Sequence, residues 1–127
     1  GQPDSYAGEI PVAYVALRAG MAATPEELHA FARQKISERA AVPTRIEVLP
    51  QLPVTAVGKI FKPALRHRAI EHVLGAALEA QGIEARIAVA EDPKEGTLAT
   101  VTVPADRAAA AADALARFTV KHRIRNS

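Results

Sequence analysis

The chain is organised around the run Leu52-Pro-Val-Thr-Ala-Val-Gly-Lys-Ile-Phe-Lys-Pro-Ala-Leu-Arg66, which has the cation Lys59 at its centre. Pro53 fixes a backbone φ angle and lacks an amide hydrogen, while Gly58 permits a turn that other residues resist. Lys59 follows directly, so the sequence predicts a rigid loop that presents an ammonium group. Such a group suits a site where negative charge develops on a phosphate or a carboxylate. On the residues alone, a surface turn with a solvated lysine is the alternative.

Two other kinds of site do not fit the sequence. A phosphate-binding P-loop needs a glycine where Pro53 stands and a hydroxyl where Ile60 stands. The chain has no cysteine, which removes disulfides, thiolate nucleophiles and cysteine-bound metals. Its 4 histidines are scattered without the spacing of metal ligands. We therefore predict no metal site.

The run from Pro53 to Lys59 resembles the last core motif of the adenylate-forming enzymes. This superfamily includes acyl-CoA synthetases, peptide-synthetase adenylation domains and luciferases. Upstream segments resemble the same superfamily in order and spacing, and they are Pro3–Glu9, Val12–Val15, Thr24–Leu28, Ala41–Pro43 and Ile46–Leu49. The resemblance covers roughly Gly1 to Ala69 and is to the small C-terminal domain, with the character of a fatty or aryl acyl-CoA synthetase.

The expected fold class is α+β. The C-terminal domain of the superfamily is a small two-layer unit of strand, helix, strand, lysine loop and helix, which we place at residues 1–72. Residues 73–127 then form an α+β extension packed on it, ordered strand, strand, helix, strand. The expected elements are a loop at 1–8, strands at 9–17, 45–49, 83–89, 99–103 and 119–124, and helices at about 24–39, 63–81 and 105–118.

Local signals set the ends and the buried faces of two helices. Thr24-Pro-Glu-Glu27 is a capping box with proline in the first helical turn, and Gly82 is placed to end the second long helix. The spacing of apolar residues predicts which side chains are buried. In the first helix these are Leu28, Phe31, Ala32 and Ile36, and in the second Leu65, Ala69, Ile70 and Val73.

The resemblance implies roles for individual residues. Lys59, held by the turn at Gly58, would contact the substrate carboxylate and the α-phosphate of ATP during formation of the acyl-adenylate. The superfamily then rotates the domain so that another face meets coenzyme A. Gly8 and Glu9 match the stretch nearest that face, and Arg33 matches the position where some acyl-CoA synthetases place an arginine against the coenzyme A phosphate. A solvated helix arginine is the alternative for Arg33.

The same resemblance implies partners that this chain lacks. ATP with Mg²⁺ would be bound mainly by a large N-terminal domain, which also builds the pocket for the carboxylic acid substrate. The 127-residue chain alone is therefore expected to be inactive. Fatty, aryl and short-chain acids all remain open. Lys59 also lies in a motif that lysine acetyltransferases modify in this superfamily, and acetylation would remove its charge.

Composition limits the other partner classes. The net charge is only +2 and aromatic residues make up 4%, so a base-stacking nucleic-acid platform is not expected. No apolar run approaches the length of a membrane span, and a cytoplasmic location is the expectation. Two further classes stay open: a non-catalytic regulatory or interaction module that keeps the fold, and a basic module that uses Lys121–Arg125 on a polyanion.

Overall fold

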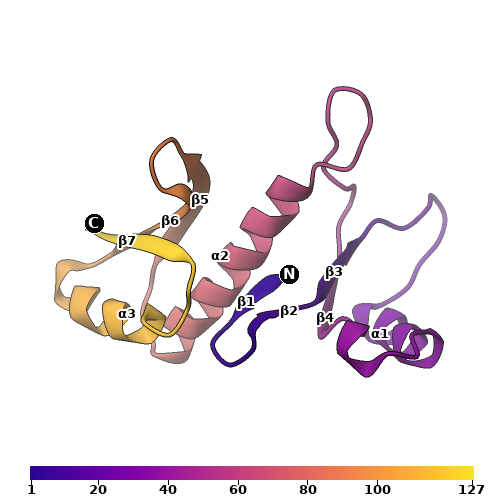
Figure 1. Cartoon of the computed structure of the whole chain (residues 1–127), viewed down its shortest axis with the longest axis horizontal. Helices are drawn as coiled ribbons and strands as arrows, with labels where there is room; N and C mark the ends of the chain where they lie inside the picture. Colours follow the sequence, from indigo (N-terminus) through magenta and orange to yellow (C-terminus); the bar gives the residue numbers. More distant parts are fainter. The chain divides into compact units, whose positions relative to one another are not determined.

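A computed structural model describes residues 1–127 and confirms the mixed α+β fold. The chain divides into two compact units (Figure 1). The first comprises Gly1 and Ile10–Leu65, and the second comprises Gln2–Glu9 and Arg66–Ser127. The domain boundary expected between residues 72 and 73, and the packing of the extension, stay predictions. None of the helices combines the length and hydropathy needed to span a bilayer.

The first unit is built on a parallel pair of strands, β3 (Val12–Val15) and β4 (Arg45–Val48). The chain between them carries α1 (Pro25–Lys35) and a short 3₁₀ turn, η1 (Arg39–Ala41). Two hydrogen bonds extend the pairing at either end, from the Thr44 N–H to the Pro11 carbonyl oxygen and from the Leu49 N–H to the Val15 carbonyl oxygen. This unit therefore has the expected strand, helix, strand order.

The start of α1 is as predicted, but its end and one packing residue are not. The Glu27 N–H donates to Thr24 Oγ1 and the Thr24 N–H donates back to the Glu27 carboxylate, which completes the capping box. The predicted end at about residue 39 was wrong, because Ile36 is already extended and closes the helix after Lys35. Phe31 is 60% exposed. A two-stranded sheet is too narrow to cover it, and its ring lies 5.8 Å from the Lys35 ammonium.

Residues 2–10 form a hairpin, so the prediction of a loop at residues 1–8 was wrong. Strands β1 (Gln2–Asp4) and β2 (Gly8–Ile10) pair with each other. The Asp4 carboxylate accepts hydrogen bonds from the N–H groups of Tyr6 and Ala7, which shapes the turn. The strand expected at 9–17 is split at Pro11, which has no N–H to pair.

The second unit contains most of α2 (Lys62–Ala80), whose end is as predicted. Gly82 is left-handed, with φ +68°. Its N–H donates to the Glu79 carbonyl oxygen, and the Ile83 N–H donates to the Leu78 carbonyl oxygen, the hydrogen-bond pair of a Schellman motif. Pro63 sits in the first turn, where its missing N–H costs little.

A three-stranded sheet completes the second unit, in the order β5 (Arg86–Asp92), β6 (Gly96–Val103), β7 (Lys121–Asn126). β5 and β6 are antiparallel, whereas β6 and β7 are parallel and joined through η2 (Ala105–Arg107) and α3 (Ala108–Leu115). The helix expected to end at Phe118 ends earlier, because residues 116–120 turn the chain into β7. The order of helix, strand, strand, helix, strand is confirmed.

The core of the second unit lies on one face of this sheet. Alternate residues of β6 point into it and are fully buried, as are side chains from α2 and α3, namely Ala99, Val101, Val103, Leu74, Leu78, Ala111 and Leu115. Of the stripe predicted for α2, Ala69 and Ile70 are buried, and Leu65 and Val73 are half-buried. Both helices thus pack on the same face of the sheet.

Candidate functional site

The lysine loop, residues 53–61, is a tight hairpin turn between β4 and α2 (Figure 1). Val54 and Ile60 form an isolated antiparallel bridge at its base. At its tip the Gly58 N–H donates to the Thr55 carbonyl oxygen at 2.9 Å, closing a four-residue turn. Gly58 then takes φ +82°, a left-handed conformation in which a glycine costs least. This turn positions Lys59 immediately after the bend.

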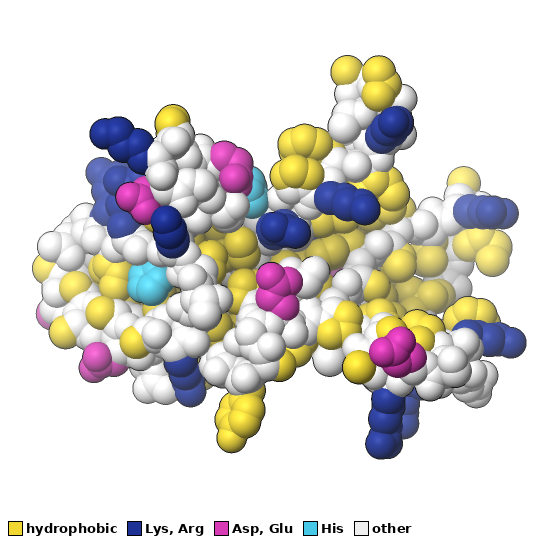
Figure 2. All heavy atoms as spheres, in the orientation of Figure 1, with side chains coloured by type: hydrophobic (Ala, Val, Ile, Leu, Met, Phe, Trp, Pro, Cys, Tyr) yellow, Lys and Arg dark blue, Asp and Glu magenta, His cyan; other side chains and the backbone are white.

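The surface of the lysine loop is unusually apolar for an exposed turn. Its hydrophobic side chains are exposed, at 58% for Val54, 81% for Val57, 50% for Ile60 and 45% for Phe61. Lys59 is exposed among them and makes no ion pair. Figure 2 shows hydrophobic side chains and a cation together on this turn. The loop therefore offers an unpartnered apolar surface with one positive charge.

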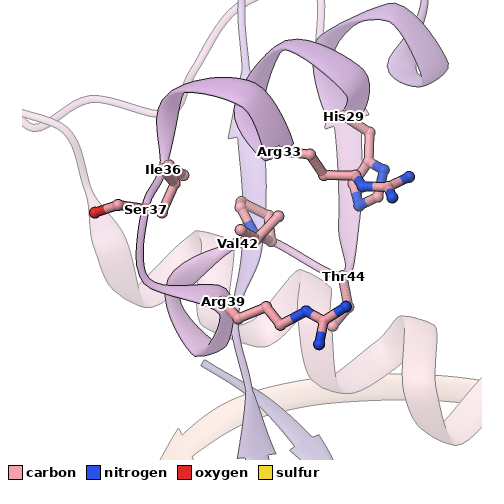
Figure 3. A pocket seen from close by; sticks show the side chains of 8 residues that line it. His29, Arg33, Ile36, Ser37, Arg39, Val42 and Thr44 are labelled. Atoms are coloured by element: carbon pink, nitrogen blue, oxygen red, sulfur yellow. The ribbon is translucent and has the colours of Figure 1, made fainter.

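A second feature of the first unit is an open hollow of about 550 Å³ beside α1. It is lined by Arg33 from α1, by Arg39 from η1 and by His29, with Thr44 at the entry to β4. Figure 3 shows the His29 and Arg33 side chains next to each other, and the Arg39 guanidinium beside Thr44. No carboxylate lines this hollow. The Thr44 hydroxyl donates to the Pro11 carbonyl oxygen at 3.1 Å, which leaves two guanidinium groups and an imidazole as a donor set suited to a phosphate.

The structure does not gather the sequence-predicted residues into one site. Lys59 and Gly58 lie on the lysine loop, whereas Arg33 lies on α1, well separated from it within the first unit (Figure 1). Gly8 and Glu9 are exposed residues of β2 and belong to the second unit. Gly8 is left-handed, with φ +83°. The roles given to these five residues stay predictions.

Sequence reasoning missed His29 and Arg39. His29 is four residues before Arg33, a spacing that places both side chains on one face of the helix, so a signal was present. The sequence held no such signal for Arg39, because its place in the hollow depends on the η1 turn that follows the early end of α1. No group of three or more acidic, histidine or cysteine side chains could hold a metal ion.

The comparisons with known proteins agree on the first half of the chain. Residues 1–59, which end at the loop lysine, match the sequence profile described as AMP-binding enzyme C-terminal domain. These residues belong to that family. The matched residues comprise the β1–β2 hairpin, the β3–α1–β4 unit and most of the lysine loop.

Several curated relatives of this chain are named as coenzyme A ligases or synthetases. The marinolic acid–CoA ligase of Pseudoalteromonas sp. (strain SANK 73390) is 37% identical over 109 residues, or 84% of this chain and 17% of that protein. The long-chain-fatty-acid–CoA ligase of Bacillus subtilis is 48% identical over 72 residues, or 57% of this chain and 13% of that protein. The acetyl-coenzyme A synthetase of Methanothrix soehngenii is 37% identical over 78 residues, or 59% of this chain and 12% of that protein.

This chain thus spans less than a fifth of the length of these relatives. The alignment with the marinolic acid–CoA ligase covers 84% of the chain, so it must extend beyond the AMP-binding C-terminal domain into the second unit. No solved structure matched the chain.

Proposed function

We propose that this chain is the C-terminal part of an acyl-CoA synthetase, which converts a carboxylic acid, ATP and coenzyme A into acyl-CoA, AMP and pyrophosphate. The observation that carries the proposal is the lysine loop. It combines a pinned turn, an exposed ammonium and an apolar surface that nothing in the chain covers. Membership of residues 1–59 in the AMP-binding C-terminal domain family and the names of the relatives support the same reaction class.

In the first half-reaction an oxygen of the substrate carboxylate attacks the α-phosphorus of ATP, and the bond to the departing pyrophosphate breaks. Negative charge accumulates on the oxygens around the α-phosphorus. The Lys59 ammonium, set by the turn at Gly58, would lie between carboxylate and phosphate and stabilise that charge. This role is electrostatic and requires only that the lysine stay protonated.

The apolar side chains of the lysine loop would contact a large N-terminal domain. The loop exposes much apolar surface for its length, on Val54, Val57 and Phe61. Burial of these side chains against a partner would stabilise the complex. That domain would supply the acid pocket and most contacts to ATP and its Mg²⁺, since this chain holds no cluster of metal ligands. The chain alone would then be inactive.

In the second half-reaction the thiol of coenzyme A attacks the acyl carbonyl, and AMP leaves. The hollow beside α1 fits a phosphate of coenzyme A, with Arg33 as its main contact. Gly8 and Glu9 would lie near the pantetheine arm. Because Arg33 and Lys59 are well separated, the two half-reactions would use different faces of the domain, each presented in turn. A cytoplasmic location suits these cofactors.

The experiment compares Lys59→Ala with Lys62→Ala in the full-length protein that contains this chain. Lys62 is a matched control, an exposed lysine three positions away. Pyrophosphate release with a panel of carboxylic acids reports adenylation, and thioester formation from supplied acyl-adenylate reports the second step. Lys59→Ala should slow adenylation by at least about 100-fold and spare the thioester step. Equal rates for both variants, or no adenylation by the unaltered protein, would exclude the proposal.

We also propose Lys59 as an acetylation target, because its side chain is exposed at a protruding turn. Acetylation would remove the charge that adenylation uses. Mass spectrometry after incubation with a lysine acetyltransferase and acetyl-CoA tests this directly. An unmodified Lys59 alongside an acetylated Lys62 would contradict it.

A further inference from the structure

The outer face of the β5–β6–β7 sheet carries positive charge, and no helix of the second unit packs on it. Because α2 and α3 pack on the opposite face, alternate residues of each strand point away from the core. We define the outer face by Arg86 on β5, Thr100 and Thr102 on β6, and Arg123 and Arg125 on β7. These positions all lie beyond residues 1–59, the part that matches the AMP-binding C-terminal domain family.

The strand register brings these side chains into rows. Arg86 is paired with Thr102, and Thr102 is paired on its other side with Arg125. Two guanidinium groups therefore flank one hydroxyl. The Cα atoms of Arg86 and Arg125 are about 10 Å apart across the sheet. Thr100 and Arg123 form the adjacent row, about 7 Å along the strands. The small side chain of Ala88, opposite Thr100, leaves the centre of the face flat and accessible.

The three arginines of the outer face form no ion pair, although the charge of Arg123 adds a little to the lowering of the pKa of Asp92, which comes mainly from the Glu95 and Lys94 N–H groups. No carboxylate lies within ion-pair distance of Arg86, Arg123 or Arg125. A guanidinium binds a planar carboxylate through two parallel hydrogen bonds, and it is more weakly hydrated than an ammonium. Three such groups on one face of a sheet, with threonine hydroxyls between them, are arranged to bind carboxylates that lie about 7–10 Å apart.

The opposite end of the outer face has mixed charge, because Lys94 and Lys121 lie there with two carboxylates. The turn between β5 and β6 holds Asp92 and Glu95, and the Glu95 carboxylate pairs with the Lys121 ammonium at 3.3 Å. Figure 2 shows Lys and Arg side chains gathered over β7, with carboxylates beside them. A polyphosphate running along the strands would therefore meet no net positive charge at this end. The face also has no aromatic side chain for stacking bases, and its one large apolar side chain, Leu98, is half-buried, too little for insertion into a bilayer.

We propose that the outer face docks an acidic segment of a partner protein, whose carboxylates contact Arg86, Arg123 and Arg125. The mixed charge pattern favours a protein surface over a nucleic acid or an anionic membrane. Because the face lies outside residues 1–59, this inference does not depend on the proposed ligase activity, and it gives the β5–β6–β7 sheet a function of its own.

The experiment measures binding of a fluorescein-labelled dodecapeptide of alternating glutamate and serine to the 127-residue chain. The triple variant R86Q/R123Q/R125Q removes the guanidinium groups, and R18Q/K35Q/R117Q removes the same charge from exposed residues elsewhere. We expect fluorescence anisotropy to show binding that weakens at least about tenfold in the first variant and less than about threefold in the second. Equal losses would mean that only net charge matters and would overturn the proposal.

Three further probes separate the partner classes. A glutamine–serine dodecapeptide should not bind, and oligothymidylate of equal length and phosphatidylserine vesicles should bind more weakly than the acidic peptide. Tighter binding of either of the last two would overturn the assignment to a protein partner. If the triple variant fails to fold, ¹⁵N chemical-shift mapping on the unaltered chain decides the question. Peptide-induced shifts should centre on β5, β6 and β7, and shifts centred on Arg33 and Arg39 would contradict the proposal.

Discussion

The Lys59 N–H donates a hydrogen bond to Thr55 Oγ1 at 3.2 Å, and the Thr55 N–H donates back to the Lys59 carbonyl oxygen at 2.7 Å. These two hydrogen bonds hold the backbone of Lys59 against Thr55, the first residue of the turn. The side-chain bond uses a hydroxyl that no apolar residue could supply. Thr55 is therefore a positioning residue for Lys59.

We expect Thr55→Val to loosen the tip of the lysine loop while leaving the fold intact, because the substitution keeps the shape of the side chain but removes the acceptor for the Lys59 N–H. Hydrogen exchange of the Lys59 amide should become faster by about fivefold to tenfold, which corresponds to a net hydrogen bond of about 1 kcal/mol. Thr55→Ser keeps the hydroxyl and is the matched control. Unchanged exchange in Thr55→Val would show that the turn alone holds Lys59.

Substitution of Gly58 should affect the loop through backbone conformation alone. A Cβ at this position would meet no atom within 4 Å, but φ is +82°. The left-handed conformation therefore raises the free energy of the folded loop by about 1–2 kcal/mol for alanine and by less for asparagine. In the full-length protein we expect Gly58→Ala to slow adenylation more than Gly58→Asn does, with little change in melting temperature. The reverse order would mean that side-chain bulk, not φ, is limiting.

The sequence predicted best those features that depend on neighbours along the chain. The capping box at Thr24 and the left-handed glycine at Gly82 each need only a few adjacent residues, and both are present. Exposure of Phe31 depends on the width of a sheet formed by distant strands, which helical periodicity does not contain. The β1–β2 hairpin was missed because strands of three residues are too short to show alternation. Arg39 reaches the hollow only because the chain leaves α1 early.

The Glu91 carboxylate should make acid stability depend on pH. It accepts hydrogen bonds from His67 Nε2 at 2.8 Å and from Thr97 Oγ1, and the bond from His67 is the main cause of its lowered pKa. Because the folded state binds this proton less readily than the unfolded state, the stabilisation is full above the ordinary pKa of 4.5 and is lost as pH falls through the lower folded value.

We therefore expect Glu91→Gln to flatten the loss of stability below about pH 4.5 and to lower stability slightly at neutral pH. Urea unfolding midpoints between pH 6 and pH 3 measure both effects. Glu84→Gln removes an exposed carboxylate of the same unit and is the control, with a small change expected. A parallel shift of the whole Glu91→Gln curve, with the acid limb as steep as before, would show that the contact with His67 does not contribute.

Gly75 lies in the interior of α2, where glycine is a poor choice for stability. Glycine in a helix costs about 0.5–1 kcal/mol relative to alanine, because the unfolded chain has more conformations to lose. A Cβ at this position would meet only the Cδ1 atom of Ile87, at 3.8 Å. That distance is an ordinary van der Waals contact, so the added methyl group would fill space against β5 without strain.

We expect Gly75→Ala to stabilise the second unit by about 1 kcal/mol and to raise its melting temperature by about 4–8 °C. Ala76→Gly makes the reverse change at an exposed position of the same helix and should destabilise by about the same amount. Thermal unfolding followed by circular dichroism at 222 nm measures both. If Gly75→Ala lowers the melting temperature while Ala76→Gly behaves as expected, the contact with Ile87 does not tolerate a methyl group, and close packing of α2 on the sheet is the reason for the glycine.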